Sequence, residues 1–419
     1  MHIVFVTVAD LPEGCGNTSR LVSLVELLSR SGHAVTILNQ HALGITSTSV
    51  QRSSGEIAGG RFEYVLGTVD RYYGLKAIQA KWKAVGTIRD RILQLYRQKR
   101  VDLVWFNQLS FYDVYPLTMQ CKKLGIPTIQ SYEDERQELT SREYVSLSRR
   151  IFAINSRMAD KWCPRRADAI IGISHYLIEK YARLSQDPNR VHLLPTIIDC
   201  NTWKCGPEPV RGVPTILYSG FLGEQDEMEE FLLALRIVRE EGLKFRFVML
   251  GGAIVRKDMN ERQARIQSQI EELGLADVVE QKGFVSRAEV RQHLEEASLL
   301  LAIRRDGVWS RSGLATKLSE YLASGRLVLT SDVGDVPKYL TNEKNALVLP
   351  GSCKAETIAE ALRLGLASRD FRNRVGHAGR QVALDNFDLP ISQQRLDSVL
   401  HGIFSSRSAF PEGQDSALR

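Results

Sequence analysis

The residues best suited to chemistry lie in one stretch, residues 304–330. Arg304 and Arg305 follow an apolar run, residues 299–303, which predicts a buried strand that ends in charged side chains. Lys317 and Glu320 come later in the stretch, three residues apart. Guanidinium and ammonium groups bind phosphate oxygens, and a carboxylate suits paired hydroxyls such as those of a ribose. The stretch therefore predicts a site for an anionic ligand.

A helix over residues 313–323 is expected to present Lys317 and Glu320. Its apolar residues have the spacing of one buried helix face, and Gly325 is a typical C-terminal stop. The first turn carries no acidic side chain, so the free N–H groups of Gly313, Leu314 and Ala315 would suit a diphosphate. The alternative is a solvated pair of Lys317 with Glu320, and arginines that merely cap a strand.

The segment from Glu320 to Val328 resembles the donor-site signature of GT-B glycosyltransferases, in the retaining group called family 4. That family carries two glutamates eight positions apart, followed by a small-residue turn and a strand. Glu320 fits the second glutamate, which the resemblance associates with the ribose. Ser312 stands where the first glutamate, associated with the donor sugar, is expected.

The same resemblance implies further donor contacts. The segment from Gly283 to Val285 is similar to the backbone that holds the nucleobase, or is a simple strand-end turn. Family members carry an arginine and a lysine after the glycine that corresponds to Gly220, and both are missing from residues 221–224. Arginines 304, 305 and 311 are candidates to replace them. The candidate catalytic residues are Arg304, Lys317 and Glu320, and the candidate donor-binding residues are Gly283, Val285, Arg305, Ser312, Gly313, Leu314 and Glu320.

The acceptor is expected in the first half of the chain. Gly16 and Asn17 lie in a glycine-rich loop between a strand and a helix, which in the resembled family faces a cleft. A dinucleotide fingerprint is disfavoured because Ser19 occupies the position of its third glycine. Glu133 and Asp134 follow a predicted strand and are candidates to orient an acceptor hydroxyl. Alternatively, they are acids at a helix N-terminus, stabilised by its dipole.

The order of elements predicts an α/β protein. Short apolar strands alternate with amphipathic helices in both halves, which favours parallel sheets covered on both faces. The resemblance implies a GT-B architecture, with two Rossmann-like doubly wound domains facing a cleft and a C-terminal helix crossing back. The expected units are an acceptor domain over residues 1–206, a donor domain over 207–388, the crossover helix over 389–405, and a flexible tail over 406–419. Residues 40–60 are expected to form a mobile loop.

Composition sets limits on partners and cofactors. The 419 residues are 43% hydrophobic and 25% charged, which is ordinary for a globular protein. A net charge of +6 fits a phosphorylated small molecule better than nucleic acid. The six cysteines and eight histidines show no metal-ligand spacing, so we expect reduced thiols and no metal site. With no Walker-type loop either, a nucleotide-diphosphate sugar is expected as co-substrate, with no further cofactor.

A basic helix is predicted within residues 71–100, which contain nine Lys or Arg and one acid. Such a helix, bearing Trp82, could contact an anionic membrane or a lipid-linked acceptor. The alternative, an outer helix with a solvated basic face, is favoured. An apolar start without a basic leader and the lack of any 18-residue apolar run predict a cytoplasmic protein, with a peripheral place on the inner membrane face as the further option.

The resemblance favours transfer of a sugar to an acceptor hydroxyl, with retention and without metal, in bacterial surface-polysaccharide or glycoconjugate synthesis. Three alternatives remain: a non-catalytic nucleotide-sugar-binding or scaffold protein, a GT-B nucleotide-sugar epimerase, and an NAD-dependent oxidoreductase. Ser312 and the missing cations after Gly220 encourage the first of these. The last is the weakest, because an acidic ribose ligand is also missing at Asn39.

Overall fold

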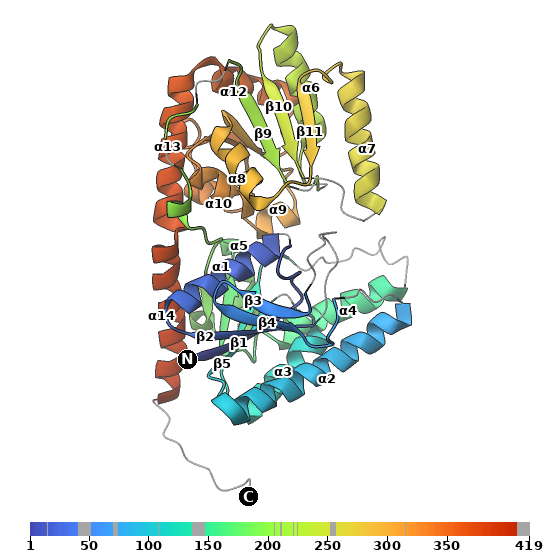
Figure 1. Ribbon diagram of the computed structural model, residues 1–419, viewed down its shortest axis with the longest axis vertical. Helices are drawn as coiled ribbons and strands as arrows, with labels where there is room; N and C mark the ends of the chain where they lie inside the picture. Colours follow the sequence, from blue (N-terminus) through green and yellow to red (C-terminus); the bar gives the residue numbers. More distant parts are fainter. Residues whose placement is uncertain are drawn as a thin grey trace, which may run out of the picture.

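The computed structural model describes residues 1–14, 16–40, 52–69, 74–107, 109–135, 147–204, 206–209, 212–220, 222–223, 225–251, 257–314 and 316–408. Two parallel-sheet α/β domains stand one above the other (Figure 1). This is the GT-B architecture that was predicted.

The first sheet has the strand order β3-β4-β2-β1-β5-β6-β7-β8. Its strands are parallel except for β3, which pairs antiparallel with β4. The strands are β1 (His2–Thr7), β2 (Ala34–Asn39), β3 (Ser54–Ile57), β4 (Gly60–Tyr64), β5 (Leu103–Asn107), β6 (Thr128–Tyr132), β7 (Ala169–Gly172) and β8 (Val191–Leu193). The helices are α1 (Gly16–Arg30), α2 (Gly74–Lys99), α3 (Phe111–Lys123), α4 (Leu147–Trp162) and α5 (His175–Ser185), with the 3-10 turns η2 (Pro188–Arg190) and η3 (Cys200–Thr202).

The second sheet is parallel throughout its described strands, with the order β11-β10-β9-β12-β13-β14. Its strands are β9 (Thr215–Ser219), β10 (Arg246–Leu250), β11 (Val279–Gly283), β12 (Leu299–Ala302), β13 (Leu327–Asp332) and β14 (Leu347–Pro350). The helices of this half are α6 (Met228–Glu240), α7 (Lys257–Glu272), α8 (Arg287–Glu296), α9 (Val308–Ser312), α10 (Thr316–Ala323), α11 (Val336–Tyr339), α12 (Ala355–Ala367) and α13 (Arg369–Asn386).

The inner strands are short and apolar because helices cover both faces of each sheet. Every residue of β1, β5 and β12 is buried, as expected for parallel strands between helical layers. Separate apolar cores form on the two faces of each sheet. The arrangement leaves the carboxyl ends of the strands as the natural place for a site.

The last helix, α14 (Leu389–Ser408), returns to the first domain. Its side chains Leu396, Val399 and Ile403 are buried in the same apolar core as Phe5 of β1. Figure 1 shows α14 running along the flank of the first domain directly below α13. Residues 406–408 belong to this helix, so the prediction that the tail begins at residue 406 is wrong. The remainder of the predicted tail lies outside the described residues.

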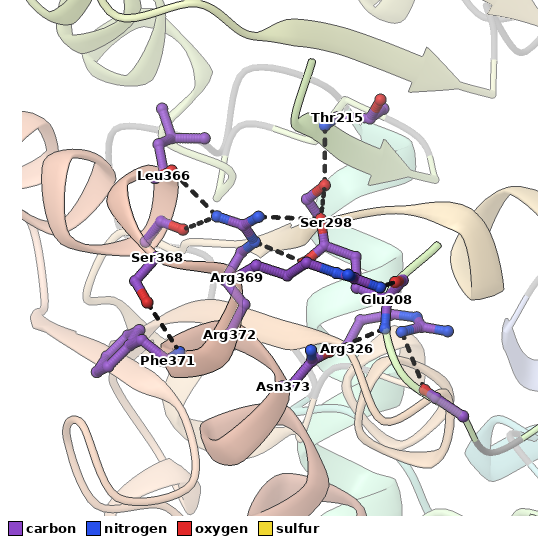
Figure 2. Close-up of polar contacts among 12 residues, drawn as sticks. Glu208, Thr215, Ser298, Arg326, Leu366, Ser368, Arg369, Phe371, Arg372 and Asn373 are labelled. Atoms are coloured by element: carbon purple, nitrogen blue, oxygen red, sulfur yellow. Dashed lines mark hydrogen bonds and ion pairs between the residues drawn. The ribbon is translucent and has the colours of Figure 1, made fainter. Parts of the chain in front are cut away.

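The segment that joins the domains is anchored by a buried ion pair. The Glu208 carboxylate lies 2.7 Å from Arg372 Nε and accepts a hydrogen bond from Ser298 Oγ at 2.5 Å. The Glu208 carbonyl oxygen accepts a hydrogen bond from Arg369, and the Glu208 backbone N–H donates to Asn373 Oδ1 at 2.8 Å (Figure 2). Residues 206–209 are therefore held against α13, although their proline-rich sequence predicts a linker. The predicted domain boundaries, after residues 206 and 388, stay predictions.

One local prediction is wrong, and one helix was missed. The expected loop over residues 40–60 contains β3, which completes an edge of the first sheet by pairing with β4; residues 41–51 lie outside the description. Helix α5 was not predicted, although Ser174 caps it by accepting a hydrogen bond from Leu177 N. In the described residues, no helix combines the length and hydrophobicity needed to span a membrane.

Candidate functional site

The carboxyl ends of the two sheets face each other. In the second sheet β9 lies between β10 and β12, so the strand order reverses there, and such a point opens a crevice beyond the strand ends. The strands β9, β10 and β11 point toward the first domain (Figure 1). A bridge between Asp226 and Arg304 joins the loop after β9 to the loop after β12. The predicted donor residues thus gather at one edge of the second sheet.

Lys317 lies in the first turn of α10 and points to the end of β9. Its Nζ is 3.4 Å from Asp226 Oδ1 and 4.0 Å from the centre of the Tyr218 ring. Burial lowers the pKa of Lys317, the Asp226 carboxylate opposes this shift, and Arg304 adds to the lowering. The alternative of a solvated pair between Lys317 and Glu320 is wrong, because the partner of Lys317 is Asp226.

Arg304 occupies the end of β12. Its backbone N–H donates to Ser331 Oγ at 2.8 Å. Among the residues described, no acceptor lies within hydrogen-bond distance of its buried Nε. Burial raises the pKa of Asp134, in the first domain, and the Arg304 guanidinium opposes that shift. Arg304 therefore lies between the domains with a donor still to be satisfied.

The other two arginines are less central. Arg305 has a half-exposed side chain 4.0 Å from Glu227 Oε1. Arg311 pairs with Asp306 at 2.7 Å on the surface. Because Arg311 already has a carboxylate partner there, we expect it to be less available than Arg304 to replace the missing cations at the end of β9.

Glu320 lies one helical turn beyond Thr316 and beside α8. Burial raises the pKa of Glu320, and Arg287 and Arg291 oppose the shift. Arg287 also reaches across to α1, where its Nη2 donates to Ser19 Oγ at 3.4 Å. Sequence reasoning missed both arginines, although their spacing of four residues places them on one helix face.

Close backbone approach at this edge depends on glycines. Gly220 and Gly251 have φ values of +133° and +106°, and a Cβ on Gly251 would lie 2.2 Å from the Gly220 carbonyl oxygen. Gly251 N donates to the Gly283 carbonyl at 2.8 Å. Gly283 has a φ of +66°, and Val285 packs partly buried on the apolar core beneath. The predicted nucleobase contact at Gly283 and Val285 stays a prediction.

The start of the predicted helix is wrong. A short helix, α9, ends at Ser312; Gly313 is extended, and α10 begins at Thr316. The side chain of Leu314 is buried in a core of the second domain, which anchors this connection. The N–H groups of Gly313 and Leu314 therefore precede the helix instead of forming its first turn, and Ala315 lies outside the description.

Two of the acceptor-side candidates, Gly16 and Asp134, lie at the boundary with the second domain, and a third, Glu133, lies inside the first domain. Gly16 begins α1 and approaches Thr316, because a Cβ on Gly16 would lie 2.8 Å from Thr316 Oγ1. Asp134 lies at the domain boundary, with its Oδ1 3.8 Å from the position that a Gly313 Cβ would take. By contrast, Glu133 is buried 3.4 Å from Arg20 Nε.

Asn17 accepts a hydrogen bond from Thr18 N at 2.8 Å, which stabilises the first turn of α1. The alternative for Glu133 and Asp134, acids at a helix start, concerns residues 136–146 and lies outside the described part of the chain. In the described residues, no group of three His, Cys, Asp or Glu side chains is arranged to hold a metal ion.

Two family models cover this chain. The model for glycosyl transferases group 1 matches residues 206–382, and the model for a glycosyl transferase 4-like domain matches residues 16–196. The chain belongs to the group 1 glycosyltransferase family.

Relatives of this group 1 family member have low sequence identity. The putative colanic acid biosynthesis glycosyltransferase WcaL of Escherichia coli is 25% identical over 248 residues, which are 57% of this chain and 58% of WcaL. The amylovoran biosynthesis glycosyltransferase AmsK of Erwinia amylovora is 24% identical over 196 residues, 46% of this chain and 45% of AmsK. The matched part thus spans about half the length of these relatives.

Solved structures share the fold of this group 1 family member. Sucrose-phosphate synthase from Thermosynechococcus elongatus superposes with a TM-score of 0.71 at 16% identity, covering 97% of this chain and all of that one. Anabaena Alr3699/HepE, in complex with UDP and glucose, gives a TM-score of 0.67 at 13% identity over 96% of this chain and 99% of its own.

Ser312, at the position of the family's first glutamate, is fully buried between the domains. Its Oγ accepts a hydrogen bond from Glu135 N at 3.2 Å and donates to Trp309 O at 3.2 Å. Its carbonyl oxygen accepts a hydrogen bond from Ser174 Oγ. These contacts occupy the Ser312 hydroxyl with protein groups, and its role in donor binding stays a prediction.

A second contact across the boundary joins His175 to Asp335. The Asp335 carboxylate accepts a hydrogen bond from His175 N at 2.8 Å and lies 3.1 Å from His175 Nδ1. No local pattern in the sequence points to this pair, since the two residues are 160 positions apart.

Proposed function

We propose that this group 1 family member transfers a sugar from a nucleotide-diphosphate sugar to an acceptor hydroxyl. The observation that carries the proposal is the convergence of Lys317, Arg304 and Asp134 at the boundary between the two sheets. Two cations and a carboxylate from opposite domains suit a diphosphate on one side and a hydroxyl on the other.

In this proposal, the second domain holds the donor. Arg304 and Lys317 bind the diphosphate and stabilise the negative charge that develops when its bond to the anomeric carbon breaks. Glu320 accepts hydrogen bonds from the ribose hydroxyls. The buried Arg304 Nε, which is without an acceptor in the described structure, supports this assignment. Anabaena Alr3699/HepE, which shares the fold, has been crystallised with UDP-glucose, so we choose UDP-glucose as the first donor to test.

The first domain holds the acceptor in the same proposal. The acceptor oxygen forms the new bond to the anomeric carbon as the bond to the diphosphate breaks, and its proton passes to the departing diphosphate. We assign Asp134 to orient the acceptor hydroxyl. The names of WcaL and AmsK favour a bacterial surface polysaccharide as the product. We therefore propose a glycan or lipid-linked acceptor, and a cytoplasmic enzyme that meets lipid-linked substrate at the inner membrane face.

Calorimetric titration of the full chain with UDP and UDP-glucose, with and without EDTA, tests the donor site. We expect binding that EDTA leaves unchanged and that Arg304→Gln weakens by about 10-fold to 100-fold, because hydrogen bonds to charged groups contribute about 1.5–3 kcal/mol. Matched Arg311→Gln should bind like the unaltered chain, since Arg311 pairs with Asp306. If a panel of nucleotide-diphosphate sugars fails to bind, the proposal is wrong.

A turnover assay with candidate acceptors tests the reaction itself. We expect transfer to an acceptor, with the donor's anomeric configuration kept in the product as seen by NMR. Conversion of the sugar nucleotide without acceptor would instead identify an epimerase. Binding without turnover by any acceptor would identify a nucleotide-sugar-binding protein, which the engaged Ser312 hydroxyl would then explain.

A further inference from the structure

Large apolar side chains are exposed together on the helices of the first domain. Ile78 and Trp82 of α2 are 53% and 65% exposed, and Ile151 and Ile154 of α4 are 49% and 54% exposed. Tyr112 of α3 is 40% exposed. Soluble proteins rarely leave such side chains grouped in water unless a partner covers them.

These side chains form one continuous surface. The rings of Trp82 and Tyr112 lie 6.2 Å apart between their centres. Tyr112 N donates to Asn155 Oδ1 at 3.4 Å, which ties the start of α3 to α4 next to Ile154. Figure 1 shows α2, α3 and α4 together on one side of the first sheet. We call this set of five exposed apolar residues and their cationic neighbours the apolar–basic surface.

The cations around the apolar side chains are exposed too. Lys76 and Lys83 lie beside Ile78 and Trp82 on α2, and the exposed cations of α4 are Arg150, Arg157 and Lys161, spaced seven and four residues apart on one face of the helix. The described acids of these three helices are engaged by neighbouring cations: Asp90 with Arg89 at 3.3 Å, Asp113 with Lys81 at 3.1 Å, and Asp160 with Lys180 at 2.8 Å. The surface is therefore positive as well as apolar.

This combination favours one kind of partner. Protein–protein interfaces are depleted of lysine, whereas here lysines flank the exposed tryptophan. Nucleic acid would not account for three exposed isoleucines. An anionic membrane accounts for both the exposed apolar side chains and the exposed cations. Aliphatic and indole groups enter the boundary between headgroups and acyl chains, while Lys and Arg side chains reach anionic headgroups.

We propose that the apolar–basic surface binds the headgroup region of an anionic lipid bilayer. The helices α2 and α4 lie along the membrane plane, with Trp82, Ile78, Ile151 and Ile154 inserted. The surface brings the first domain to the membrane, and its binding is separate from the donor site.

Co-sedimentation of the full chain with lipid vesicles tests the proposal. One vesicle type is phosphatidylcholine, and the other is an equimolar mixture of phosphatidylcholine and phosphatidylglycerol. We expect binding to the second type that weakens as salt is added, because screening reduces attraction between exposed charges. A chain with no affinity for the anionic vesicles, or with equal affinity for both types, overturns the proposal.

Variants locate the surface. Ile78→Gln with Trp82→Gln should weaken vesicle binding on the order of tenfold or more, since two inserted apolar groups are lost. Lys76→Gln with Lys83→Gln should weaken it about fivefold per charge. The matched controls are Leu364→Gln on α12 and Lys244→Gln with Lys344→Gln, exposed positions of the second domain, and they should bind like the unaltered chain. Controls that lose as much binding as the variants contradict the placement.

Two further measurements keep the result interpretable. Circular dichroism and the thermal midpoint should match the unaltered chain, which shows that each variant is folded. Phosphatidylglycerol with brominated acyl chains should quench the tryptophan fluorescence of the unaltered chain, and the quenched fraction should fall in both Trp82→Phe and Trp82→Gln. If the chain instead forms a dimer that Trp82→Gln dissociates, the surface is an interface between copies and the proposal is wrong.

Discussion

Lys317 and Asp226 form an ion pair where the donor diphosphate is proposed to bind. Variants can separate the contribution of Lys317 to stability from its contribution to donor binding. Lys317→Met leaves the Asp226 carboxylate, 2% exposed, without its cation. We expect the free energy of unfolding in urea to fall by about 2–4 kcal/mol, slightly below the range for fully buried pairs because Lys317 keeps some solvent contact. The double variant Lys317→Met with Asp226→Asn should regain most of this stability.

The same pair of variants should differ from the unaltered chain in UDP binding. Both lack the cation for the diphosphate, so both should bind UDP at least tenfold more weakly in calorimetry. A double variant that binds UDP normally would show that Lys317 has a structural role alone.

Glu320 offers a test that depends on pH. Burial raises the pKa of Glu320 in the folded protein. Protonated Glu320 therefore contributes to the free energy of unfolding in full below the ordinary glutamate pKa of about 4.3. This contribution is lost as the pH rises through the raised pKa of Glu320 in the folded protein. Glu320→Gln should abolish this loss, so that its urea midpoint exceeds that of the unaltered chain most clearly near neutral pH.

Although Glu320→Gln should raise the stability of the protein, it should weaken donor binding. Replacing the carboxylate removes a charged hydrogen-bond acceptor, so UDP-glucose should bind about tenfold or more weakly. Glu289→Gln, an exposed acid that caps α8, is the control for binding. Normal UDP-glucose binding by Glu320→Gln would remove Glu320 from the donor site.

At the scale of residues, the sequence could predict the charged residues of the candidate donor site, but it could not predict the side chains that contact them. Arg304, Lys317 and Glu320 were predicted from one local stretch. Asp226, Arg287 and Arg291 come from other elements, and their proximity depends on how the strands are ordered in the sheet. Ser312 was flagged as a departure, but its burial between the domains follows from contacts with Ser174 and Glu135 that lie far away in the chain.

At the scale of elements, the buried ion pair between Glu208 and Arg372 holds residues 206–209, which join the two domains, against α13. Glu208→Gln would leave Arg372, which is 5% exposed, without its carboxylate. We expect the free energy of unfolding to fall by about 3 kcal/mol or more. The matched control is Glu241→Gln, which removes an exposed pair with Arg363 and should change the free energy of unfolding little, because solvent screens exposed ion pairs. Equal losses in the two variants would contradict the role of the network in Figure 2.

Most helices and strands could be predicted at the scale of elements, because their apolar residues repeat with a clear period. The exceptions have physical causes. A helical period continues through Leu314, yet this residue lies outside both α9 and α10, because its side chain fills a core while Ser312 is held by the first domain. Strand β3 has alternating exposure and little apolar character, so only pairing with β4 specifies it.

At the scale of the whole molecule, α14 completes the apolar core of the first domain, although it is the last helix of the described chain. Leu396 is fully buried in a core shared with β1 and β2. Leu396→Ala should lower the free energy of unfolding by about 2–5 kcal/mol through the cavity it leaves. Hydrogen exchange should speed up in β1 and β2 and stay unchanged in β9 and β12.

Leu364→Ala on α12, where the side chain is 36% exposed, is the matched control and should change stability by less than about 1 kcal/mol. Faster exchange in β9 instead of β1 would contradict the assignment of α14 to the first domain. The crossing of this helix was implied by the family resemblance. The side chains that α14 contacts could be identified only from the structure.

The position of α14 also bears on how the protein is made. Ribosomes deliver the first sheet about two hundred residues before the helix that completes its core, at roughly 5–20 residues per second. During that interval, the apolar core that includes Phe5 and Leu24 lacks the side chains that α14 contributes, Leu396, Val399 and Ile403 among them. The nascent first domain must therefore wait in an unfinished state, exposed to chaperones, until the last segment is synthesised.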